Sequence, residues 1–108
     1  MPPPKPQAPV TQRYAIACEG PGDSAFFIEL CAARGIQTFH IGPAGGREEF
    51  SRYLIGLVQA SSLKPLDAIL IVGDNNGGVT DSFRRVQNQV RMAQFHTNLS
   101  VPSEPFEL

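Results

Sequence analysis

The chain has 108 residues, of which 42% are hydrophobic and 18% are charged, and its formal net charge is −1. This length is enough for one domain with a buried core, and the composition is that of a globular protein rather than a disordered one. The near-neutral charge excludes a globally basic nucleic-acid-binding protein, so a polyanion would have to be held by a local patch or through a metal ion.

Residues 1–12 are predicted to form a flexible proline-rich arm. They contain five of the ten prolines and a single charged side chain, on Lys5. Such a composition favours extended, solvated backbone and offers little to bury in a core. We therefore expect the ordered domain to span residues 13–101. Residues 102–108 are interpreted as a tail or as a domain end that is interrupted.

The ordered part begins with a predicted strand and helix. Residues 14–18 form a short apolar run that is closed by a glycine-rich turn, as strands commonly are. Asp23 or Ser24 is expected to cap the helix that follows, which ends at Gly35. This helix places three apolar side chains at helical spacing, namely Phe27, Leu30 and Cys31.

A second strand and helix follow. The strand is expected at residues 36–41 and its loop at residues 42–46. The next helix has the clearest period in the chain, with apolar side chains at positions i, i+3, i+4, i+7 and i+8. These side chains are Phe50, Tyr53, Leu54, Leu57 and Val58.

Residues 68–72 are apolar at every position, which predicts a strand in the middle of a parallel sheet. Thr80 or Asp81 then caps a helix with Phe83, Val86 and Val90 on one side, and residues 99–101 are a candidate fourth strand. Alternation of strands and helices predicts an α/β fold of three layers. We expect a Rossmann-like parallel sheet of three to four strands with helices on both faces.

The two cysteines lie within apolar segments, which predicts buried free thiols rather than a disulfide or a metal site. No stretch has the length and apolarity of a membrane span, and the proline-rich start lacks the apolar core of a signal peptide. The expected location is therefore the cytoplasm, with no membrane partner.

Two acidic residues follow strands that are expected to be parallel, Glu19 after the first and Asp74 after the third. The carboxyl ends of parallel strands are where α/β folds carry their chemistry. Two carboxylates there would suit a hard cation such as Mg²⁺, and Asn76 offers an amide oxygen nearby. The alternative is that Glu19 is an exposed acid at a turn and that residues 74–76 only form a turn beside Gly77 and Gly78.

The segment that opens with Gly20 and Gly22 also fits the loose dinucleotide-binding pattern G-x-G-x-x-A between a strand and a helix. Asp23 within it places a negative charge beside the expected pyrophosphate. Gly77 and Gly78 form a second glycine-rich loop that is able to approach a phosphate. Three basic residues are the candidate contacts to nucleic acid: Arg47, Arg84 and Arg85.

Together these segments resemble the Toprim domain, the metal-binding module of topoisomerases, bacterial primases and overcoming-lysogenization-defect nucleases, and in particular small Toprim-like proteins of bacteria. The resemblance rests on residues 18–27 and 71–78 and covers roughly residues 13–95. It implies that Glu19 acts as general acid or base and that Asp74 supplies the first carboxylate to Mg²⁺. Asn76 stands where the family has its second aspartate.

Three functions follow from these observations as expectations. The first is a Toprim-like domain that acts on nucleic-acid phosphodiesters as a magnesium-dependent nuclease or phosphodiester transferase. Because Asn76 carries no charge, the second is an inactive relative that associates with a protein or a nucleic acid. The third is a nucleotide-binding Rossmann-like domain. An exposed sheet edge also predicts pairing with a second copy, a homodimer.

Overall fold

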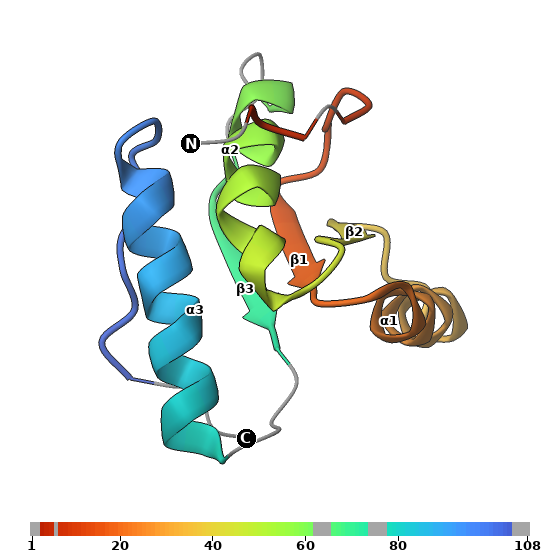
Figure 1. Ribbon diagram of the computed structural model, residues 1–108. Coiled ribbons are helices and arrows are strands. Elements are labelled where there is room, and N and C mark those ends of the chain that lie inside the picture. The colour runs from red at the N-terminus through yellow and green to blue at the C-terminus, as the bar shows by residue number, and fades with distance from the viewer. Residues whose placement is uncertain (1–2, 6, 62–65, 74–77, 105–108) are drawn as a thin grey trace.

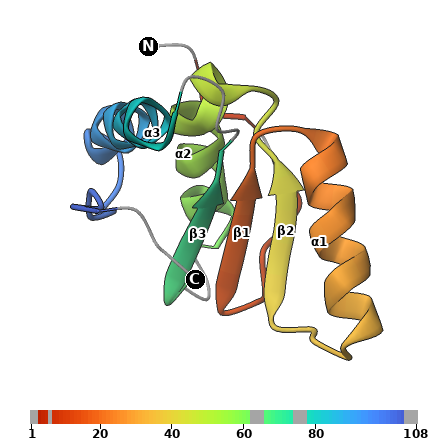
Figure 2. The ribbon, with the colours of Figure 1, turned by 90° about the horizontal axis from the view of Figure 1, so that it is seen from below.

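The computed structural model describes residues 3–5, 7–61, 66–73 and 78–104. In this part of the chain, three parallel strands form one sheet in the order β2-β1-β3 (Figure 2). The strands are β1 (Tyr14–Cys18), β2 (Phe39–Pro43) and β3 (Ala68–Val72). The sheet is parallel throughout, as the alternation of strands and helices predicts.

Helices cover both faces of the sheet, which confirms the three-layer α/β fold. Helix α1 (Pro21–Ala33) contacts β1 and β2 on one face. On the other face, the 3-10 turn η1 (Arg47–Glu49) leads into α2 (Phe50–Ala60), and α3 (Val79–Gln94) packs beside α2 (Figures 1 and 2). None of the helices in the described segments is long and apolar enough to cross a bilayer.

The core lies between the sheet and α2. Alternate side chains of β1 and β3 point toward this helix, because successive residues of a strand face opposite sides of a sheet. One cluster joins α2 to β1, through Ala15, Ala17, Phe50, Tyr53 and Leu57. A second joins α2 to α3, through Leu54, Ile55, Val90 and Ala93. The helical period at residues 50–58 therefore marks the side of α2 that faces the core.

The prediction that residues 68–72 occupy the middle of the sheet is wrong. The central strand is β1, and β3 pairs with it along one edge. Ile69 and Ile71 pack toward α2, but Leu70 on the opposite face is 41% exposed. An apolar pattern on both faces indicates burial, yet it does not encode which strand lies between two others.

The start of α1 differs from the prediction, whereas its end at Gly35 agrees with it. Its N-cap is Gly20 and not Asp23 or Ser24, and a glycine has no side chain to accept the free N–H groups of the first turn. Pro21 follows at the start of the helix, where its missing N–H needs no acceptor. At the other end Gly35 adopts a φ of 67°, and the Ile36 N–H donates to the Cys31 carbonyl at 2.8 Å. This is a Schellman cap, so Ile36 belongs to the helix end and β2 begins three residues later than expected.

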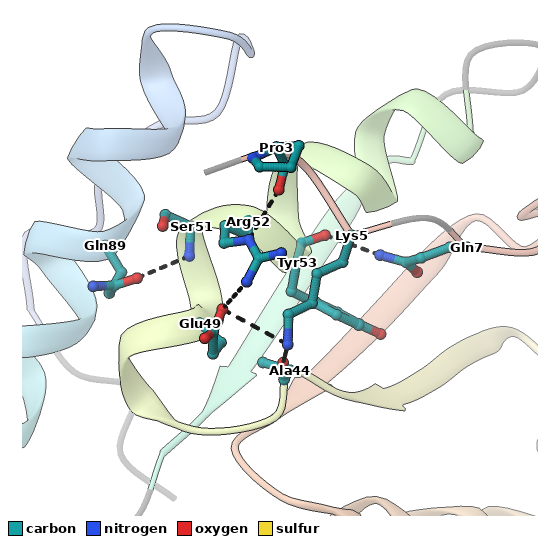
Figure 3. A network of polar contacts seen from close by, with 9 residues as sticks. All are labelled: Pro3, Lys5, Gln7, Ala44, Glu49, Ser51, Arg52, Tyr53 and Gln89. Atoms are coloured by element: carbon teal, nitrogen blue, oxygen red, sulfur yellow. Dashed lines mark hydrogen bonds and ion pairs between the residues drawn. The ribbon is translucent and has the colours of Figure 1, made fainter. Parts of the chain in front are cut away.

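Pro3, Lys5 and Gln7 of the predicted arm lie along α2 (Figure 3). Val10 is part of the core. Val10 is only 3% exposed, and its N–H donates to the Ala60 carbonyl. The expectation that this segment offers little to bury in a core is therefore wrong for Val10. At the other end of the domain, residues 99–101 have no strand geometry, and Leu99 and Val101 pack against the second core cluster.

Candidate functional site

The backbone of Glu19 continues β1 beyond its last residue and is held from both sides. Its N–H donates to the Val72 carbonyl at 3.1 Å. Its carbonyl accepts the N–H groups of Gly45, at 3.1 Å, and Gly46, at 2.8 Å. Both glycines have positive φ angles, 98° and 130°, which other residues rarely adopt. Glu19 is thus fixed at the carboxyl end of the sheet, as the sequence predicts.

Arg47 forms an ion pair with Glu19. Its Nε lies 3.3 Å from Oε1 of the carboxylate, and the two side chains are 28% and 16% exposed. Arg47 is the first residue of η1 and directly follows the two glycines that hold the Glu19 carbonyl. The same loop therefore positions both the backbone and the charge partner of Glu19. Sequence reasoning selected both residues but did not predict that they contact each other.

Ser82 and Arg85, on the first turns of α3, complete the walls of a small pocket with this ion pair. The pocket encloses about 10 Å³ and is lined by Glu19, Arg47, Phe50, Gly73, Ser82, Arg85 and Val86. A cavity of this size has room for about one water molecule, so a larger ligand would bind at its mouth. Arg85 also pairs with Asp81 at 3.3 Å, one helical turn earlier, and both side chains are about half exposed.

The residues that line this pocket do not by themselves fit a magnesium site. Mg²⁺ prefers several oxygen ligands in octahedral geometry. Glu19 is the acidic residue among the lining residues, and its carboxylate contacts the cationic Arg47. In the part of the chain that the structure describes, no three His, Cys, Asp or Glu side chains gather as metal ligands. The predicted ligands Asp74 and Asn76, as well as Gly77, lie outside the described residues.

The remaining predicted residues lie around this site but do not line it. Gly20 is the N-cap of α1, and Gly22 and Asp23 lie exposed in its first turn. Gly78 is the N-cap of α3. Arg84 is exposed on α3, and its neighbour Arg85 reaches the pocket instead. Of the three predicted basic contacts, Arg47 and Arg85 therefore share one pocket with Glu19.

Sequence reasoning gave no role of their own to two pocket residues, Gly73 and Ser82. Both are found by position, since Gly73 follows β3 and Ser82 lies in the first turn of the next helix. In a parallel sheet these are places where ligands contact backbone and hydroxyl groups. Their positions, directly after a strand and at the start of a helix, are the sequence signal that marks them.

Neither thiol is a candidate nucleophile in this pocket. Cys18 and Cys31 are both free, as predicted, although Cys31 is only partly buried. Burial, with a smaller contribution from the charge of Asp23, raises the pKa of Cys18 to about 11. Its thiol is therefore protonated and unreactive at neutral pH.

A larger groove of about 480 Å³ lies away from this site, between α1 and β2. Its walls are mostly apolar and include Ile28, Ile36 and Ile41, with His40 and Cys31 among them. Burial lowers the pKa of His40 below its ordinary value of 6.5, so His40 is largely neutral at pH 7. None of the described residues that line the groove is Asp, Glu, Lys or Arg, and the carboxyl end of the sheet remains the candidate functional site.

No protein-family model, curated protein or solved structure significantly matches this chain.

Proposed function

We propose that this protein is a Toprim-like domain that associates with the phosphodiester backbone of a nucleic acid at the carboxyl end of its sheet. One observation carries the proposal: Arg47 and Arg85 reach the same small pocket from two different elements. Guanidinium groups form charge-assisted, often bidentate hydrogen bonds with phosphate oxygens. The Ser82 side chain adds a polar group from the first turn of α3, and Asp81 in the same turn pairs with Arg85 and lowers the net positive charge there.

In this proposal Glu19 orients Arg47 rather than carrying out chemistry. The ion pair fixes the guanidinium at the pocket, and it also lowers the net positive charge that a phosphate meets. This matches the expectation of an inactive relative that associates with nucleic acid. Weak binding follows from the overall charge of −1, because only a local basic surface attracts the polyanion.

A magnesium-dependent nuclease or phosphodiester transferase is the second candidate. It is favoured by the hydrogen bond from Glu19 to Val72, which brings Glu19 alongside the end of β3, and Asp74 follows Gly73 in the sequence. Since the lining residues do not fit Mg²⁺ by themselves, we derive no catalytic step.

Free thiols support the further proposal of a reducing, cytoplasmic location. Pairing with a second copy along the outer edge of β2 also stays a proposal.

Fluorescence anisotropy with a labelled single-stranded oligonucleotide, in EDTA and at increasing NaCl concentration, tests the association. Arg85→Ala should weaken binding about tenfold, equivalent to roughly 1.4 kcal/mol for one charge-assisted hydrogen bond. It should also lower the slope of log K against log salt by about one. Arg91→Ala is the matched control, because it removes the same charge from the same helix about 9 Å farther along its axis.

Two other results would redirect the proposal. Equal losses in Arg85→Ala and Arg91→Ala would show that binding depends on overall charge and not on this pocket. Cleavage of plasmid or single-stranded DNA with Mg²⁺ or Mn²⁺, abolished in Glu19→Gln, would support the nuclease instead.

A further inference from the structure

The N-terminal strap, defined here as residues 3–5 and 7–10, crosses α2 and is tied to it by backbone and side-chain hydrogen bonds. The Lys5 N–H donates to the Arg52 carbonyl at 3.3 Å, and Gln7 Nε2 donates to the Tyr53 carbonyl at 2.9 Å. Arg52 Nε donates in turn to the Pro3 carbonyl at 2.9 Å (Figure 3). These contacts join residues nearly fifty positions apart in the sequence.

Gly56 permits this crossing. It lies within α2, where glycine is less favourable than alanine by about 1 kcal/mol. A Cβ built on Gly56 would overlap the carbonyl oxygen of Lys5, so the strap approaches the helix backbone as closely as a glycine allows. The close approach of the strap therefore explains why a glycine, which weakens the helix, occupies position 56.

The side chain of Lys5 reaches from the strap to the loop at residues 44–46. Its Nζ donates to the Ala44 carbonyl at 2.7 Å and lies 3.7 Å from Oε2 of Glu49. Glu49 is also paired with Arg52, at 2.9 Å, so one carboxylate connects the strap, η1 and α2 (Figure 3). The ammonium group packs against Gly45, where a Cβ would lie 2.8 Å from Nζ.

The opposite side of the same loop holds the candidate functional site. The Ala44 N–H donates to the Cys18 carbonyl at 2.7 Å, and Gly45 and Gly46 donate to the Glu19 carbonyl. Arg47 follows immediately in the chain. The loop therefore lies between Lys5 on one side and the end of β1 on the other.

We propose that Lys5 is a positioning residue, through which the N-terminal strap holds the loop at residues 44–46 and keeps Arg47 beside Glu19. Loss of this contact leaves two consecutive glycines, which are flexible, to position Arg47. The consequence for nucleic-acid binding rests on the proposed function. The structural consequence does not, because the loop geometry is measurable without a ligand.

Two variants test separately the charge of the Lys5 side chain and the position of the strap. Lys5→Met removes the ammonium group and keeps the length of the side chain. Gly56→Ala changes no residue of the strap but displaces it, because the added Cβ would overlap the Lys5 carbonyl oxygen, while the alanine favours the helix. Lys5→Arg is the conservative variant, and Arg34→Met is the charge-matched control, since Arg34 is exposed at the end of α1.

The readout is the position of the ¹H–¹⁵N resonances of the Gly45 and Gly46 amides and of the Arg47 side-chain Nε–Hε. All three should shift in Lys5→Met and in Gly56→Ala, return toward the wild-type positions in Lys5→Arg, and stay unchanged in Arg34→Met. Oligonucleotide affinity should fall roughly threefold in the first two variants. Circular dichroism on each variant confirms that the helices remain.

Unshifted Gly45 and Gly46 amides in both Lys5→Met and Gly56→Ala would overturn the proposal. Shifted amides together with no oligonucleotide binding by the wild-type protein would support the positioning role and reject the proposed function. Shifted amides with an unchanged affinity would reject the link from Lys5 to the site.

Discussion

Arg47 Nε lies 3.3 Å from Oε1 of Glu19, and the carboxylate that the sequence marks as a catalytic group is thereby paired with a cation. Both side chains are largely buried, so solvent screens the pair only in part. The two proposed functions, association with phosphate and metal-dependent chemistry, give the Glu19 carboxylate different roles. In the first case Glu19 moderates a basic site, and in the second it is indispensable.

Replacing Glu19 by glutamine should strengthen oligonucleotide binding, because the glutamine amide keeps an oxygen that accepts from Arg47 Nε and so still orients it, while the negative charge is removed. Removal of one negative charge at contact distance from a phosphate is worth roughly 1 kcal/mol in water, or about fivefold in affinity. Anisotropy titrations in EDTA measure the effect, with Glu29→Gln on the exposed side of α1 as the charge-matched control. Weaker binding by Glu19→Gln than by Glu29→Gln would contradict the role that we assign to the ion pair.

Gly42→Ala should destabilise the fold. A Cβ at this position would lie 2.5 Å from the hydroxyl of Tyr53, which is buried in the core under β2. Burial, with a smaller contribution from Cys18, raises the pKa of Tyr53 to about 12, consistent with a phenol that has little solvent around it. We expect a loss of about 1–3 kcal/mol in the free energy of unfolding, measured by urea denaturation.

Gly22→Ala is the matched control for that substitution. Gly22 lies in the first turn of α1, and no atom of the described residues lies within 4 Å of an added Cβ. Alanine favours the helix there, so this variant should be as stable as the wild type or more so. Equal stabilities for Gly42→Ala and Gly22→Ala would show that Tyr53 moves aside without cost.

The thiols should react at different rates. With its pKa near 11 and its side chain buried, Cys18 should react with an aromatic disulfide reagent at pH 8 only as the protein opens. Cys31 is partly exposed and should react first. Cys31→Ser should remove the fast phase, and both thiols of the wild type should react rapidly in urea. A fast phase that persists in Cys31→Ser would contradict the burial of Cys18.

Acid should destabilise the protein through His40. Its pKa is lowered by burial, so the unfolded chain binds a proton more readily than the folded one, and stability falls as the pH drops below the ordinary value of 6.5. The free energy of unfolding of the wild type should decrease more than that of His40→Gln between about pH 7.5 and about pH 5.5. Parallel pH profiles for the two proteins would mean that His40 remains solvated.

The sequence predicts the layers of this fold because the periods of its apolar residues are strong. The helix at residues 50–58 and the strands at residues 14–18 and 68–72 follow from these periods alone. Strand order does not, since an edge strand such as β3 has the same apolar pattern as a central one. The position of the strap also could not be predicted from the apolar pattern, because its contacts are backbone hydrogen bonds to α2 and a close approach at Gly56.

Three residues of the candidate pocket, Glu19, Arg47 and Arg85, could be selected from the sequence for a different reason. Charged residues that follow parallel strands lie at the carboxyl end of the sheet, and Glu19 lies there. The partners of a charge depend on loop geometry over distances of nearly thirty residues, as between Glu19 and Arg47. Sequence spacing carries no information on such a contact, and Arg84 and Arg85 looked equivalent although only Arg85 lines the pocket.

The most direct test of nucleic-acid association is a map of the amides that respond to a ligand. In a ¹H–¹⁵N titration with a short single-stranded oligonucleotide in EDTA, the amides of Glu19, Arg47, Gly73, Ser82 and Arg85 should shift together and saturate at one dissociation constant. Amides that line the groove between α1 and β2, such as Ile28 and Ile36, should stay in place. Shifts confined to that groove, or none at the carboxyl end of the sheet, would contradict the account.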